Sequence, residues 1–327
     1  MSIRALFQAA KVKDASPPYD TIHLKVFYPA QMSGSAREQD LGIVPADAQR
    51  SPFKVVIFFN GINCSPEMYQ WLAVKLAERG LVVVTFSWVA QNLPGIVALT
   101  PGVDIRMLSA NTYGSGPTAS ALPVLLEALE GLQAEGVLAG LLDLQHIILG
   151  GHSAGGSVAI QNANPRFFPQ IVAAFAYGAH TAAGLQLGYP PGTILPLPDA
   201  LPLMLIGGTC DGVIAKSGYR YGVDWSQATT PLLRTFREAI AGGRDDSYLL
   251  LLEGANHFSI AYPFDSTTGR PFLDYPATQP EDQLRNLLAE AIGLFIDAHV
   301  RHQPIAYAAL NQRSWANNPL IAQVKRK

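Results

Sequence analysis

Gly151-His152-Ser153-Ala154-Gly155-Gly156 directly follows the apolar run His146-Ile147-Ile148-Leu149-Gly150. This order predicts a strand that turns sharply into a helix, with Ser153 at the turn. Gly-x-Ser-x-Gly is the pattern of a nucleophile elbow, in which a strained turn holds a serine hydroxyl in a cleft. The flanking glycines are needed because neighbouring backbone comes too close for a Cβ. Residues 157–163 can continue as a helix until Pro165, so this context favours a reactive serine over a bystander in a glycine-rich turn.

The rest of the chain alternates predicted strands with predicted helices. Apolar, β-branched runs at residues 55–59 and 81–86 are typical of central parallel strands buried on both faces. Residues 22–28 alternate in polarity, which indicates an antiparallel strand near one edge. We expect further strands at 146–150, 171–177, 203–207 and 248–252, and helices at 66–80, 120–132, 231–241 and 281–299. This order predicts an α/β fold, a mostly parallel sheet with helices on both faces.

The composition narrows the class of protein. The chain has 327 residues, of which 49% are hydrophobic, and a net charge of −2, which gives no electrostatic footprint for nucleic acid. Only 15% of residues are charged, which fits either a large core or an apolar substrate mouth. Two cysteines, Cys64 and Cys210, do not form a disulfide framework. Because we find neither a signal peptide nor an apolar run of about 18 residues, we expect a soluble cytoplasmic protein without a membrane span.

We expect a single domain over residues 1–327, with a core at about 20–300. A polar connection at 29–51 is predicted to be a surface loop. The connections at 90–118, 179–201 and 261–280 follow strands, at the edge where open α/β sheets bind ligands. They are interpreted as lid-like walls of a pocket, with plain surface loops as the alternative. The tail at 303–327 is predicted to be a strap on the domain, with peripheral contact to a membrane surface as the alternative.

A serine nucleophile needs a base, and the base needs an orienting acid. On this fold the chain order is serine, then acid, then histidine. Asp211 follows the apolar run 203–207, and His257 follows the run 248–252. Because both residues come just after adjacent predicted strands, they can meet Ser153 at one edge of the sheet. The alternatives are that Asp211 is an ordinary turn residue and that His257 is an ordinary loop histidine.

Other titratable residues are weaker candidates. Glu253 is too close to its own strand end to act as the acid, and Asp265 comes after the histidine. His152 is fixed beside the nucleophile, and His180 follows the strand before the acid, so neither has the order of a base. Together with Phe258 they are expected to line the substrate pocket. No group of residues has metal-ligand spacing, and no phosphate-binding loop is present, so no metal or cofactor is expected.

An acyl-transfer site also needs backbone N–H groups that stabilise an oxyanion. One donor is expected to be the N–H of Ala154, the residue after the nucleophile. The second should come from the loop after an earlier strand, Phe59-Asn60-Gly61-Ile62-Asn63-Cys64. Gly61 allows the chain to turn there, and we assign the second donor to the N–H of Ile62.

With these residues in place, the chain resembles an α/β-hydrolase over roughly residues 20–300. Asn60-Gly61-Ile62, Gly207-Gly208-Thr209-Cys210-Asp211-Gly212 and Gly254-Ala255-Asn256-His257-Phe258 are similar to the branch of chlorophyllases, cutinase-like polyester hydrolases and dienelactone hydrolases. Ser153 stands where dienelactone hydrolases carry cysteine, and Ala154 stands where plant chlorophyllases usually carry arginine. Polyester hydrolases are typically secreted with a disulfide, which this sequence does not indicate. The resemblance is therefore nearest to chlorophyllase-like esterases.

Together, the residues and the resemblance predict a serine carboxylic ester hydrolase. Ser153 would attack the ester, His257 would move the proton and Asp211 would orient His257, with no cofactor. The low charge and the apolar connections favour a hydrophobic ester, such as a phytyl or other long-chain ester. An acyltransferase or a lipase-like enzyme would use the same residues. A non-catalytic binder of apolar ligands is the alternative from another class, although the complete serine, acid and histidine count against it.

Overall fold

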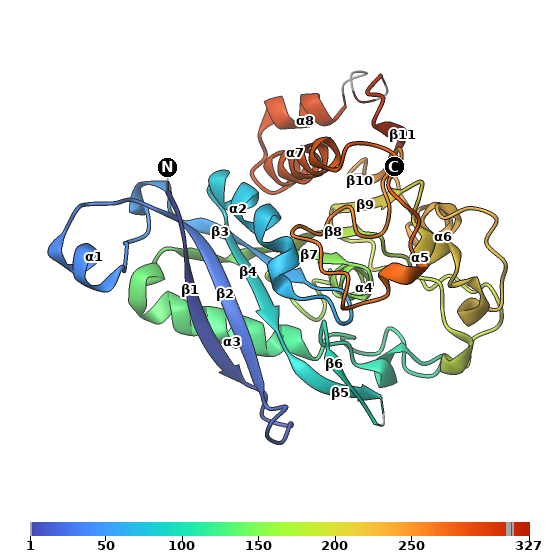
Figure 1. The fold of residues 1–327 in the computed structure, drawn as a ribbon, viewed down its shortest axis with the longest axis horizontal. Coiled ribbons are helices and arrows are strands. Elements are labelled where there is room, and N and C mark those ends of the chain that lie inside the picture. Colours follow the sequence, from blue (N-terminus) through green and yellow to red (C-terminus); the bar gives the residue numbers. More distant parts are fainter. Residues whose placement is uncertain (1, 94, 312–314, 316) are drawn as a thin grey trace.

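A mixed, mostly parallel β-sheet forms the centre of the computed structural model, which describes residues 2–93, 95–311, 315 and 317–327 (Figure 1). Within these residues the sheet has nine strands in the order β1-β2-β4-β3-β7-β8-β9-β10-β11. The central strands of this order, β4, β3, β7, β8, β9 and β10, run parallel to one another. The strands β1, β2 and β11 pair antiparallel at the two edges. The bounds are β1 Ser2–Lys11, β2 Thr21–Ala30, β3 Phe53–Phe59, β4 Val82–Ser87, β7 Leu142–His152, β8 Ile171–Tyr177, β9 Leu203–Gly208, β10 Ser247–Leu252 and β11 Ile321–Arg326.

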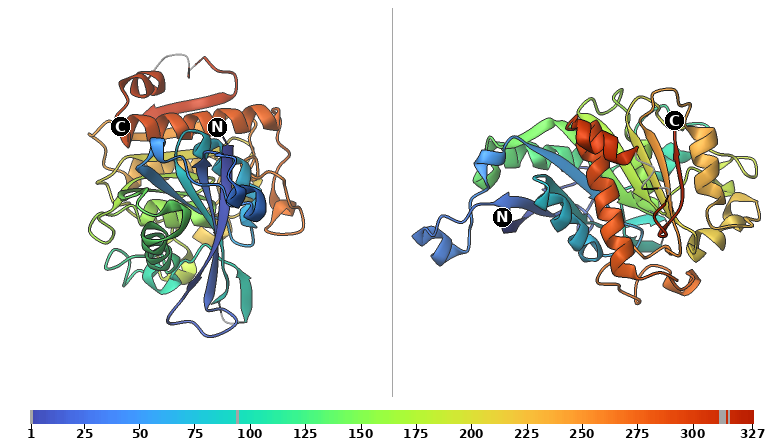
Figure 2. Two further views of the ribbon diagram at one scale, coloured as in Figure 1. Left: turned by 90° about the vertical axis from the view of Figure 1, so that its left-hand side faces the viewer. Right: turned by 90° about the horizontal axis from the view of Figure 1, so that it is seen from above.

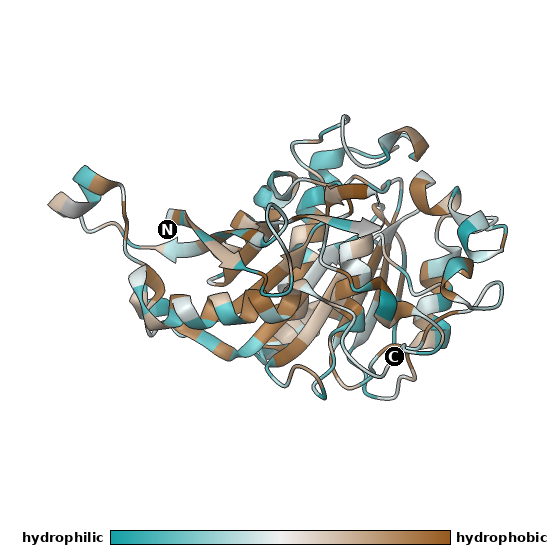
Figure 3. Ribbon diagram, turned by 90° about the horizontal axis from the view of Figure 1, so that it is seen from below, coloured by the Kyte–Doolittle hydropathy of each residue, from teal (hydrophilic) through white to brown (hydrophobic). Residues whose placement is uncertain are grey.

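The central strands are apolar throughout because both of their faces are buried. In β3, Val55, Ile57 and Phe59 face one hydrophobic cluster. Val56 and Phe58 face the other cluster, as the two-residue period of a strand requires. Figure 3 shows this directly, since the strands at the centre of the sheet are mostly brown and the outer helices and loops carry more teal. The hydrophobic cores therefore lie on either side of the sheet, with helices over each.

Helices cover both faces, as Figure 2 shows with α7 above the sheet and α3 below it. The cluster that contains Ile57 includes side chains of α3, α4 and α6, and the opposite cluster includes side chains of α2, α7 and α8. The helix bounds are α1 Ala36–Leu41, α2 Gln70–Glu78, α3 Ala121–Ala134, α4 Ala154–Gln161, α5 Gly212–Ala215, α6 Thr230–Arg234, α7 Glu281–His299 and α8 Pro304–Leu310. This arrangement confirms the predicted α/β class, with a mostly parallel sheet and helices on both sides.

Several local expectations need correction. The predicted helix at 231–241 is a short α6 followed by a π-helical turn, Thr235–Ala239. The connection at 29–51 contains α1, and the one at 90–118 begins with a hairpin of β5 (Val89–Leu93) and β6 (Ile96–Leu99). The tail is more than a strap, because β11 adds a strand to β10.

The strands β7, β8, β9 and β10 end at neighbouring positions, so the segments that follow them gather at one edge of the sheet. Ser153 follows β7 directly, and the segments that carry Asp211 and His257 follow β9 and β10. Among the residues that the structure describes, none of the helices combines the length and the apolar character needed to cross a bilayer.

Candidate active site

Ser153 sits at a strained turn between β7 and α4. Its backbone has φ 54° and ψ −124°, a region that a residue with a Cβ rarely adopts. The turn is closely packed: a Cβ on Gly151 would lie 2.4 Å from the carbonyl oxygen of Gly155, and a Cβ on Gly155 would lie 2.3 Å from the carbonyl oxygens of Phe59 and Asn60. The glycines of the Gly-x-Ser-x-Gly pattern therefore let α4 begin directly against the end of β3.

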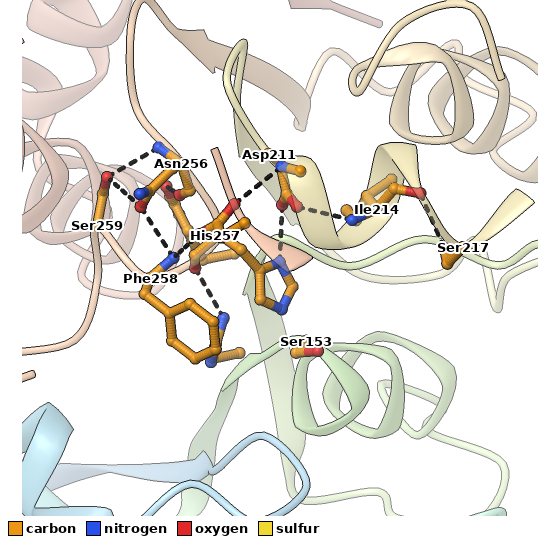
Figure 4. A network of polar contacts seen from close by, with 12 residues as sticks. Ser153, Asp211, Ile214, Ser217, Asn256, His257, Phe258 and Ser259 are labelled. Carbon is orange, nitrogen blue, oxygen red and sulfur yellow. Dashed lines mark hydrogen bonds and ion pairs between the residues drawn. The ribbon is translucent and has the colours of Figure 1, made fainter. Parts of the chain in front are cut away.

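His257 and Asp211 form a buried pair next to this serine. The Nδ1–H group of His257 donates to Oδ2 of Asp211 over 2.8 Å, and the side chains are only 4% and 2% exposed. The other carboxylate oxygen of Asp211 accepts the N–H of Ile214 over 2.8 Å, which caps α5 and fixes the carboxylate. Figure 4 shows the His257 ring between Asp211 and Ser153, with its second nitrogen on the side of Ser153.

His152 holds the backbone of the His257 segment rather than lining a pocket. The Tyr69 hydroxyl donates to Nδ1 of His152 over 2.8 Å, and Nε2–H of His152 donates to the carbonyl oxygen of His257 over 3.0 Å. Complete burial, reinforced by nearby His257, lowers the pKa of His152 well below its ordinary value, so the ring is neutral, as these two bonds require. The Gly61 N–H donates to the Tyr69 oxygen over 3.3 Å, which links the chain of bonds to the loop after β3.

Asp274 joins the segments that carry Asp211 and His257. Its Oδ1 accepts the N–H of Gly212 over 2.8 Å, and its Oδ2 accepts the N–H of Phe258 over 3.2 Å. Burial, together with nearby Asp211, raises the pKa of Asp274. No sequence pattern points to Asp274, because its role depends on the path of the connection 261–280.

Neither of the two competing acids, Glu253 and Asp265, makes a hydrogen bond or ion pair with the His257 ring in the described structure. Asp265 accepts hydrogen bonds from Thr267 and Thr268 within its own turn. The backbone N–H of Glu253 donates to the carbonyl oxygen of Leu320 instead, which ties this residue to the C-terminal segment. Of the three acids considered from the sequence, Asp211 is the one that contacts His257.

The two backbone N–H groups predicted to bind an oxyanion flank Ser153. Neither the N–H of Ile62 nor that of Ala154 donates a hydrogen bond to any residue that the structure describes. Asn60 shapes the loop, since its Nδ2 donates to the carbonyl oxygens of Gly61 and Cys64, each over 3.0 Å. The N–H groups of Ile62 and Ala154 are therefore available to a ligand at Ser153.

A cavity of about 340 Å³ opens at this point. Ser153, His257, Ile62 and Ala154 all line it, and so does His180. The connections at 90–118 and 179–201 contribute apolar lining side chains, namely Val103, Ile105, Leu108, Ala182, Ala183, Leu187 and Leu195, and the connection at 261–280 contributes Arg270.

His152 and Phe258 do not line the cavity, contrary to the sequence-based expectation. His152 is fully buried and Phe258 is 7% exposed. Both rings pack against His257, with ring centroids 4.6 and 5.2 Å from the His257 ring. They are therefore part of the support behind His257.

No protein-family model matches this chain, and a search of curated proteins finds no relative. Among the described residues, no three His, Cys, Asp or Glu side chains gather as a metal site would need. The geometry around Ser153 is therefore the observation that bears on function.

Proposed function

We propose that this protein is a serine carboxylic ester hydrolase with an α/β-hydrolase fold. The observation that carries the proposal is the alignment of Asp211, His257 and Ser153 at one edge of the sheet, where Ser153 and His257 line one cavity and Asp211 is buried behind His257. Ile62 and Ala154, whose backbone N–H groups have no hydrogen-bond partner among the described residues, line the same cavity. Nucleophile, base, orienting acid and oxyanion donors are the parts that acyl transfer to serine requires.

In the proposed reaction, the Ser153 hydroxyl oxygen forms a bond to the ester carbonyl carbon while Nε2 of His257 takes the hydroxyl proton. Asp211 keeps the proton of His257 on Nδ1, so that Nε2 is free to accept, and it stabilises the imidazolium that forms. The N–H groups of Ile62 and Ala154 bind the developing oxyanion.

Collapse of the tetrahedral intermediate breaks the bond to the alcohol oxygen, which receives the proton from His257. Water then attacks the acyl-enzyme with His257 again as the base, which releases the acid and restores Ser153. Besides water, the steps use groups of residues that line the cavity and Asp211, which contacts His257.

The lining supports an ester with an apolar body, in the manner of chlorophyllase-like esterases. Side chains such as Val103, Ile105, Leu108 and Leu195 provide apolar surface for it. Burial of an apolar group there contributes about 25 cal/mol for each Å² removed from water.

A fluorophosphonate probe tests the proposal, because it labels a serine only when its base and oxyanion donors are in place. Wild-type protein should be labelled and should hydrolyse p-nitrophenyl esters, and Ser153→Ala should lose both properties. Ser157→Ala is the matched control, since Ser157 lines the same cavity one turn later in α4 and should keep its labelling. Failure of folded wild-type protein to react, or persistent labelling of Ser153→Ala, would overturn the proposal.

A further inference from the structure

Two arginines line the cavity that contains Ser153. Arg220 comes from the 3-10 turn Gly218–Tyr221, which follows α5, and Arg270 comes from the connection 261–280, just before the 3-10 turn Pro271–Leu273. Among the described residues, no aspartate or glutamate lines this cavity. The cavity therefore carries two positive charges on a wall that is otherwise apolar or neutral.

Neither arginine is matched to a carboxylate of the protein. The Nε–H of Arg220 donates to the hydroxyl oxygen of its neighbour Tyr219 over 3.2 Å. The Arg270 side chain makes no hydrogen bond or ion pair with any residue in the described part of the chain, and its backbone carbonyl oxygen accepts the N–H of Leu273. By contrast, eight other arginines in the described part of the chain pair with carboxylates: Arg79, Arg106, Arg234, Arg237, Arg244, Arg285, Arg301 and Arg326.

The position of Arg270 makes its lack of a partner costly. The preceding residue, Gly269, lies against Cys64 and Phe258, at 3.6 and 3.4 Å from where its Cβ would be, so Arg270 starts beside the loop that carries Ile62. Burial lowers the pKa of Arg270, and the positive charge of Arg220 lowers it further. A guanidinium that loses water beside a like charge and without a counter-ion destabilises the folded protein, and an anion bound at Arg270 and Arg220 would relieve this cost.

We propose that Arg220 and Arg270 form an anion subsite, and that the preferred substrate is an ester with a free carboxylate, such as a monoester of a dicarboxylic acid. The planar guanidinium matches a carboxylate with two parallel N–H···O bonds. The apolar lining then contacts the hydrocarbon part of the molecule, so the substrate is amphiphilic rather than purely hydrophobic. Attack by Ser153 on this ester rests on the proposed function, whereas binding of the carboxylate does not.

The kinetic test compares two p-nitrophenyl esters of glutaric acid, one with a free carboxylate and one whose second carboxyl is a methyl ester. Wild-type protein should prefer the anionic ester in kcat/KM by about 10- to 100-fold, the range expected for charge-assisted hydrogen bonds. Arg270→Met should abolish most of this ratio, and Arg270→Lys should restore part of it. Arg166→Met is the matched control, because Arg166 is exposed, stacks on Phe167 and does not line the cavity.

A binding test separates failure of the subsite from failure of the proposed chemistry. Titration calorimetry with Ser153→Ala should show binding of monomethyl glutarate that weakens at least about 10-fold when Arg270→Met is added. Esterase activity without a preference for the anionic ester would overturn the subsite and leave the hydrolase standing. If the protein bound monomethyl glutarate through Arg270 but hydrolysed no ester, the hydrolase would be overturned and the subsite would stand. Tighter binding of inorganic phosphate than of monomethyl glutarate would overturn the assignment to a carboxylate.

Discussion

Substitution of Gly155 by alanine would strain the contact on which the Ser153 turn depends. The added Cβ would lie 2.3 Å from the carbonyl oxygens of Phe59 and Asn60, and both atoms are backbone. Carbon and carbonyl oxygen rarely approach closer than about 3.3 Å, so α4 and the end of β3 would have to separate by about 1 Å. Overpacking of this kind destabilises a fold by about 1–3 kcal/mol.

The same displacement should reduce activity more than stability. Ala154 stands at the start of α4 and Ile62 stands in the loop after β3, so a shift between these elements moves the two N–H groups apart. A misplacement of about 1 Å costs roughly 100-fold in rate when catalysis depends on positioned donors. We therefore expect Gly155→Ala to fold with a lower midpoint of urea unfolding and to lose about 100-fold in kcat on a p-nitrophenyl ester.

Gly131→Ala is the matched control for this experiment. Gly131 lies within α3, and an added Cβ there would have no heavy atom within 4 Å apart from the nearby backbone of its own helix. Alanine is the better helix former by up to about 1 kcal/mol, so this variant should be slightly more stable and fully active. If Gly155→Ala matched the wild type in both stability and kcat, the close packing of α4 on β3 would not be what positions the site.

Two further predictions concern buried groups around Ser153. Tyr69→Phe should lower the free energy of unfolding by about 1–3 kcal/mol, because it leaves Nδ1 of His152 without a donor and Gly61 without an acceptor. The control Tyr262→Phe, at an exposed tyrosine, should change the free energy of unfolding by less than about 0.5 kcal/mol, as measured by urea titration. Burial, with nearby His257, lowers the pKa of His180 to about 3 in the folded protein. As the pH falls below 6.5, the His180 ring is therefore protonated in the unfolded chain before it is protonated in the folded protein. Stability should therefore decline from pH 6.5 toward 3 by at most about 1.4 kcal/mol per pH unit from this residue, and His180→Gln should have a flatter profile; an unchanged profile would contradict burial of a neutral ring.

The central strands could be predicted because burial on both faces leaves an apolar run that no other element explains. The prediction at 171–177 matches β8, and the run at 55–59 falls within β3. The edge strands β1 and β11 were not predicted because their sequences are half polar. β1 and β11 are strands only because β2 and β10 offer them free hydrogen-bonding edges, which is a property of the tertiary fold.

The residues of the candidate site also differ in how well they could be predicted from the sequence. Ser153, Asp211 and His257 follow strands in a fixed order, so their meeting depends on the sheet, which the sequence encodes strongly. Asp274 and Arg270 come from a connection that folds back over the sheet edge, and no periodicity reports the path of such a loop.

The residues that follow strands would perform the chemistry, whereas the arginines in the connections would select the substrate. The strained backbone of Ser153 costs about 1–3 kcal/mol and persists because the fold fixes it on every side. The Ser153 N–H donates to the carbonyl oxygen of Tyr177 over 2.9 Å, and the Ser153 carbonyl oxygen accepts the N–H of Ser157 over 3.0 Å. Arg220 and Arg270 lie in 3-10 turns and connections that take no part in that scaffold. Substitutions at these two arginines should therefore alter which ester is preferred while the geometry at Ser153 is retained.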